Sequence, residues 1–164
     1  MKRLALLLAA SIALSGCGLR PLYADGNRGV AANTLSEISV APISGRDGWL
    51  VRTALIDRIG DHGDSARYRL EVKLDDQIQG LGLRSDATTT RERRTLRARY
   101  KLVDTVENRL IVDTTAGSDV GIDIVNSEYA TVAAEQTALE RLAERVADQI
   151  VTRIAVNAGK ADPK

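Results

Sequence analysis

The sequence lacks phenylalanine and has a single cysteine, a single histidine and a single tryptophan among its 164 residues. One cysteine excludes a disulfide within the chain. One histidine leaves little room for a histidine-based metal site or a Ser-His-Asp triad. Because aromatic residues make up only 3% and hydrophobic residues 44%, we expect a folded core of leucine, isoleucine, valine and alanine rather than disorder.

The chain also lacks an excess of charge of either sign. Its formal net charge is +1, from 23 basic and 22 acidic residues. Two of the basic residues, Lys2 and Arg3, lie in a segment that we expect to be removed, which leaves a net charge of −1. A balanced charge argues against a nucleic-acid partner, because general nucleic-acid binders are basic overall.

The N-terminus is typical of a bacterial lipoprotein signal. Two basic residues precede a largely apolar run at residues 4–14, which is too short for a transmembrane helix of about 20 residues. The run ends in Leu14-Ser15-Gly16-Cys17, which resembles the lipobox, a cleavage site before a cysteine that receives lipid. We therefore expect residues 1–16 to be removed and Cys17 to carry several acyl chains as a membrane anchor. The alternative is an ordinary secretory signal followed by an incidental cysteine.

Residue 18 indicates where the anchored protein resides. It is glycine rather than aspartate, which by resemblance to bacterial sorting rules favours the outer membrane over retention at the inner membrane. No later hydrophobic stretch approaches about 18 residues, so the rest of the chain is expected in the periplasm. Since acylation would consume the only thiol, we expect no thiol chemistry and no cofactor besides the lipid on Cys17.

The remainder divides into three parts. Residues 17–34 are rich in glycine, asparagine and aspartate with little periodicity, and are predicted to form a lipidated tether. Residues 35–158 carry periodic apolar patterns and are predicted to form one domain, as expected at this length. Residues 159–164 are predicted to be a polar tail.

Apolar periodicity predicts the elements of that domain. Strands are expected at residues 35–42, 67–79, 87–104 and 109–115, and helices at about 47–59 and 127–156. Residues 117–126 are loop-like, although the alternation of Val120, Ile122 and Ile124 could extend the last strand past a bulge. The order β-α-β-β-β-α predicts an α+β two-layer sandwich, with two helices on one face of a sheet of about four strands.

No catalytic motif is present. Residues 80–85 lack the third glycine of a dinucleotide-binding loop. The segment 117–121 places its serine one position too early for a nucleophile elbow. The acidic pairs Asp75-Asp76 and Asp61/Asp64 are expected to be solvated. We therefore expect neither an enzyme nor a metal site.

One predicted strand carries an unusual row of positive charge. Alternate residues of a strand share a face about 6.6–6.8 Å apart, so five cations would line roughly 33 Å of one face. We call these five residues the basic row: Arg91, Arg93, Arg97, Arg99 and Lys101.

Like charges so close together need anionic partners, and the sequence leaves two kinds open. Glu71 and Asp75 on the preceding strand, or acids of a partner protein, would neutralise the basic row across strands. Alternatively, the row binds phosphates or carboxylates, which arginine holds through two parallel hydrogen bonds. In the periplasm the natural anion would be a lipid head group or a polysaccharide.

Three segments together resemble the LptE family of lipopolysaccharide-assembly lipoproteins, in its alphaproteobacterial form. The most specific is Gly16-Cys17-Gly18-Leu19-Arg20-Pro21-Leu22-Tyr23. The second is Tyr100-Lys101-Leu102-Val103-Asp104 with Asn108-Arg109-Leu110. The third is Ser127-Glu128-Tyr129-Ala130 with Ala133-Ala134-Glu135 and Leu142-Ala143-Glu144-Arg145.

The resemblance implies a non-enzymatic lipoprotein of the cell outer membrane, with two helices on a four-stranded sheet. It implies a one-to-one complex in which the chain plugs an LptD-type outer-membrane β-barrel, assists its assembly and helps deliver lipopolysaccharide to the outer leaflet. It also implies lipopolysaccharide binding through basic residues, and we assign that role to the basic row from its charge pattern. The alternative function is an auxiliary periplasmic lipoprotein of a lipid or ABC transport system.

Overall fold

The computed structural model describes residues 30–83, 89–125 and 127–161. The predicted signal and the predicted lipidation site Cys17 lie outside these residues, so both stay predictions. The described elements, in chain order, are α2 (Val30–Leu35), β1 (Ile38–Val40), α3 (Gly45–Ile59), the 3-10 turn η2 (Gly63–Ser65), β2 (Tyr68–Leu83), β3 (Thr89–Asp104), β4 (Arg109–Asp123) and α4 (Glu128–Ala161).

The four strands form one sheet in the order β1-β2-β3-β4. β1 runs parallel to β2 and pairs with it over only three residues, whereas β2, β3 and β4 form long antiparallel pairs. The β3–β4 hairpin turns through Asn108, whose φ of 49° lies in the left-handed region that asparagine tolerates. This turn lies between the strands predicted at residues 87–104 and 109–115.

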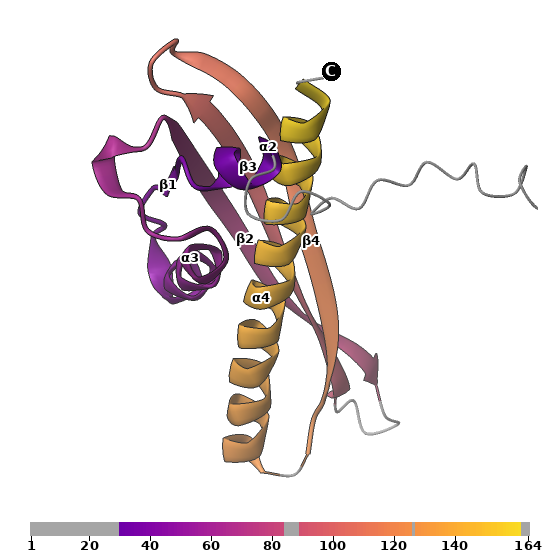
Figure 1. Ribbon diagram of the computed structural model, residues 1–164. Helices are drawn as coiled ribbons and strands as arrows, with labels where there is room; N and C mark the ends of the chain where they lie inside the picture. The colour runs from indigo at the N-terminus through magenta and orange to yellow at the C-terminus, as the bar shows by residue number, and fades with distance from the viewer. Residues whose placement is uncertain (1–29, 84–88, 126, 162–164) are drawn as a thin grey trace, which may run out of the picture.

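The helices cover one face of the sheet and leave the other open (Figure 1). Even-numbered residues of β3 point toward the helices and are buried from Leu96 to Asp104, whereas odd-numbered residues from Arg91 to Lys101 are mostly exposed. A stripe along α4 packs in the same core, with Leu142, Val146, Ile150 and Ile154 at steps of four. The predicted α+β two-layer architecture is therefore confirmed, and among the described residues its buried core is aliphatic apart from Tyr100. No described helix is long and apolar enough to span a membrane.

The first part of the domain differs from the prediction of two helices, because α2 is a third. Residues 30–34 were expected in the tether and residues 35–42 in a strand, but α2 occupies Val30–Leu35 and β1 only Ile38–Val40. Leu35 is buried in the core, and α2 packs against α4. Six residues are too few to show a helical period, so the sequence could not reveal this helix.

The second difference is the length of β4. The expectation of a loop at 117–126 was wrong for most of that range, because β4 continues to Asp123. The alternative of a longer strand is correct, although the register shift lies earlier, where Leu102 and Val103 of β3 face Val112 and Leu110. α4 also continues past residue 156 to Ala161.

α4 closes the outer edge of β4 with side chains. The Gln149 side chain accepts a hydrogen bond from the Gly117 N–H and donates one to the Gly117 carbonyl, both at 3.2 Å. Arg153 donates to the carbonyl of Thr115. These contacts occupy backbone groups that a further strand would need, so the edge is blocked at this point.

Candidate functional site

The basic row lies on the open face of the sheet, opposite the helices. All five of its side chains are exposed, and all five stand at odd-numbered positions of β3. The prediction that the five cations share one face of the strand, made from the alternation of the sequence, is thus confirmed. β2 and β4 flank them on either side, so the partners of the row depend on the register of both neighbours.

Four of the five cations pair with aspartates of β4. The N–O distances are 2.8 Å for Arg91–Asp123, 3.7 Å for Arg93–Asp119, 3.0 Å for Arg99–Asp113 and 3.9 Å for Lys101–Asp113. Arg99 binds Asp113 through both Nε and Nη2, each at 3.0 Å. This fork lowers the pKa of the Asp113 carboxyl and raises the pKa of Arg99.

The acidic partners of the basic row therefore lie on β4, whereas the sequence pointed to Glu71 and Asp75 on β2. Glu71 faces Lys101 and Asp75 faces Arg97 in the register, yet among the described residues neither acid forms an ion pair. Asp75 instead accepts hydrogen bonds from Gln77 at 3.1 and 3.2 Å. A signal for the true partners was present, because Asp113, Asp119 and Asp123 are separated by even numbers and so share one face of a strand.

Arg97 is the exception in the basic row, because within the described part of the chain it forms no ion pair. Gly117 lies directly opposite it on β4 and offers no side chain. A Cβ built on Gly117 would stand 3.3 Å from Arg97 Cγ, so the arginine stem lies against the bare backbone.

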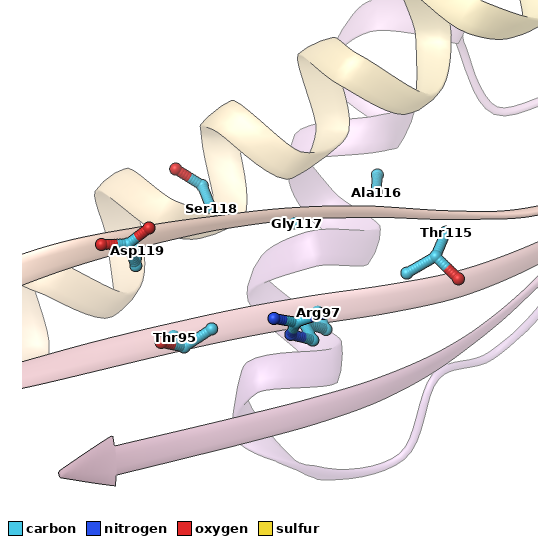
Figure 2. A pocket seen from close by; sticks show the side chains of 7 residues that line it. All are labelled: Thr95, Arg97, Thr115, Ala116, Gly117, Ser118 and Asp119. Carbon is cyan, nitrogen blue, oxygen red and sulfur yellow. The ribbon is translucent and has the colours of Figure 1, made fainter.

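The space around Arg97 is a groove of about 310 Å³, shown in Figure 2. Thr95 and Thr115 bring hydroxyl groups to it, and Asp119, the partner of Arg93, brings a carboxylate. Among the described residues, no group forms an ion pair with the Arg97 guanidinium beside them. A phosphate or carboxylate oxygen is the group that such a set of donors binds best.

A second groove, of about 410 Å³, opens where β1 leaves the sheet. Its uncharged lining residues are Ala41, Pro42 and Val72. Its charged lining consists of one carboxylate and four cations: Glu71, Arg69, Lys73, Arg99 and Lys101. We call it the edge groove. Its excess of cations makes it a second position where an acidic group would be stabilised.

Arg94 shows that charge on β3 is not all available for binding. It points toward the helices, binds the Asp76 carboxylate through Nε at 3.0 Å and donates to the carbonyl of Glu135 at 2.8 Å. The hydrogen bond to Asp76 raises the pKa of Arg94. Arg94 is therefore a structural residue that fastens β2 and β3 to α4.

In the described part of the chain, no three histidine, cysteine, aspartate or glutamate side chains gather as metal ligands would.

The chain matches a family of known proteins over most of its length. The model of the family described as "LptE: Lipopolysaccharide-assembly" matches residues 35–154. The chain belongs to the LptE family. The resemblance found in the sequence is thereby confirmed, and the family places the chain in lipopolysaccharide assembly.

Solved structures share the fold of this LptE-family chain. A lipoprotein of Caulobacter crescentus is 27% identical, with a TM-score of 0.67 over 81% of this chain and 98% of that one. A minor lipoprotein of Acinetobacter baumannii is 14% identical, with a TM-score of 0.58 over 74% and 92%. Rare lipoprotein B of Shewanella oneidensis is also 14% identical, with a TM-score of 0.54 over 76% and 97%. No match was found among the curated proteins.

Proposed function

We propose that this chain is a non-catalytic outer-membrane lipoprotein, anchored through acyl chains on Cys17, that plugs an LptD-type β-barrel in a one-to-one complex. In this role it assists assembly of the barrel and helps pass lipopolysaccharide to the outer leaflet. The family match over residues 35–154 is the observation that carries the proposal. The lipoproteins of similar fold and the lipobox at residues 14–17 support the anchor.

The open face supports the lipopolysaccharide part of the proposal. Lipopolysaccharide carries phosphate and carboxylate groups, and Arg97, in the middle of an exposed row of cations, forms no ion pair with the described residues. Because the aspartates of β4 already hold the other four cations, a new anion at Arg97 would displace no partner found among the described residues. The polar character of the same face also suits the polar lumen of a β-barrel.

Co-purification tests the plug. A tagged full-length chain, extracted from outer membranes in mild detergent, is expected to bring down one large β-barrel protein in equal molar amount. Protein stain and mass spectrometry measure the ratio. Recovery of the chain alone would contradict the plug, and recovery with a transport ATPase would favour an auxiliary transport lipoprotein instead.

A further inference from the structure

Among the described residues, nothing pairs with the outer edge of β2 over most of its length. The last bond from the preceding segment runs from the Ala41 N–H to the Leu70 carbonyl at 3.0 Å, and Pro42 follows. Backbone groups of successive residues face alternate sides of a strand, so those of every second residue from Val72 to Gly80 face the same way as those of Leu70. In the described part of the chain, no strand pairs with this side beyond Leu70. Figure 1 shows this half of β2 running past the short β1.

The two edges of the sheet therefore differ in how their outward backbone groups are paired. α4 occupies backbone groups of β4 with Gln149 and Arg153, while nothing comparable is found along β2 from Val72 to Gly80 within the described residues. An open edge is a template for pairing with another chain, and proteins usually block it. Here the described residues block the β4 edge near Gly117 and leave the β2 edge unpaired.

The side chains along the open edge indicate what would pair with it. On the helix side, Leu74 is partly buried and Ile78 is 42% exposed, so apolar groups of an added strand would gain contacts there. On the open side, Lys73 stands at the edge groove, and neither it nor Arg69 forms an ion pair among the described residues. The complementary strand has apolar residues on one face and an acidic residue opposite Lys73 on the other.

We propose that the β2 edge from Val72 to Gly80 accepts an extended segment of the barrel partner as a fifth strand, with a carboxylate of that segment seated in the edge groove. This inference rests on the proposed function, because the barrel supplies the strand. A phosphate ligand would use the cations of the edge groove but would leave the outward N–H and carbonyl groups unpaired. Only a polypeptide satisfies both, as in other cases of strand addition.

A matched pair of variants at Ile78 tests this. Ile78→Pro removes one outward N–H, and proline is tolerated on a free edge because that N–H has no partner in the isolated chain. Ile78→Thr keeps the N–H and the strand preference. We expect Ile78→Pro to recover several-fold less barrel protein than Ile78→Thr, with equal melting temperatures for the two isolated variants. Equal recovery by both would overturn the proposal.

Hydrogen exchange of the unaltered chain tests it without any substitution. Amide hydrogens at residues 72–80 that face the free edge are expected to exchange rapidly in the chain alone and slowly in the complex with the barrel. Rapid exchange in an intact complex would refute strand addition while leaving the plug in place. Failure to recover any barrel would refute both. Protection by lipopolysaccharide vesicles alone would assign the edge to the lipid and refute a polypeptide occupant.

Discussion

Replacing Asp104 by asparagine is expected to lower the melting temperature by roughly 10 °C, because breaking a buried ion pair leaves uncompensated polar groups. Asp104 is 0% exposed at the end of β3. Arg67 donates to its Oδ2 from Nε at 3.0 Å and from Nη2 at 2.9 Å. The N–H groups of Val106 and Glu107 donate to its Oδ1 at 3.0 and 3.1 Å. The carboxylate therefore ties β2 to the β3–β4 turn, and an asparagine would point an NH₂ group at one of these donors.

The control for this variant is Asp119→Asn, which removes an exposed aspartate paired with Arg93 at 3.7 Å. We expect its melting temperature to fall by no more than about 2 °C, as surface ion pairs contribute little. Thermal unfolding followed by circular dichroism measures both variants. An Asp104→Asn variant as stable as Asp119→Asn would contradict a structural role for Asp104.

Acid sensitivity gives a second readout of the same residue. The Glu107 N–H, with help from Arg67 and Val106, lowers the pKa of Asp104 below its ordinary value of 3.8. A lowered pKa in the folded state means that the stabilisation is complete above the unfolded pKa and is lost as the pH falls through the folded pKa. The unaltered chain should therefore lose stability more steeply than Asp104→Asn below about pH 4. Asp113, whose pKa is also lowered, is retained in both and leaves a shallower common slope.

Reversing Arg93, Arg97 and Arg99 to glutamate is expected to weaken lipopolysaccharide binding by roughly 100-fold, since charged hydrogen bonds are replaced by repulsion. The three side chains are exposed, so the domain should remain folded. The matched control reverses Arg46, Arg141 and Arg145, which are exposed on the helices and change the net charge equally. Binding to immobilised lipopolysaccharide measures both. Equal losses of binding in the two triple variants would mean that net charge, and not the position of the basic row, determines lipopolysaccharide binding.

Single substitutions within the basic row sharpen the test. Arg97→Ala should weaken binding by roughly 10-fold, because it removes the cation of the basic row that pairs with no aspartate among the described residues. Arg91→Ala should have a much smaller effect, since Asp123 already holds Arg91 at 2.8 Å. The reverse order would mean that the β4 aspartates move aside on binding.

The sequence predicted what depends on local periodicity. Strict alternation along β2 and β3, and the α4 stripe from Leu142 to Ile154, each identify one element and its buried face. Features that depend on strand register could not be predicted from the sequence. No local pattern indicates that Asp113 stands beside Arg99, or that Gly117 lies opposite Arg97. The burial of Asp104 is indicated by the sequence, because this charged residue continues the alternating series of buried residues Leu96, Ala98, Tyr100 and Leu102. A charge on a buried face requires partners, which here are Arg67, just before β2, and the backbone N–H groups of the adjacent β3–β4 turn.

The most direct test of lipopolysaccharide binding on the open face is photo-cross-linking in intact cells. A photoreactive residue at position 115 lines the groove of Arg97 and leaves all five cations of the basic row in place. The same residue at position 145, exposed on α4, is the control. We predict a lipopolysaccharide adduct at position 115 and none at position 145. Adducts to protein alone at position 115, or equal lipopolysaccharide adducts at both positions, would contradict the assignment.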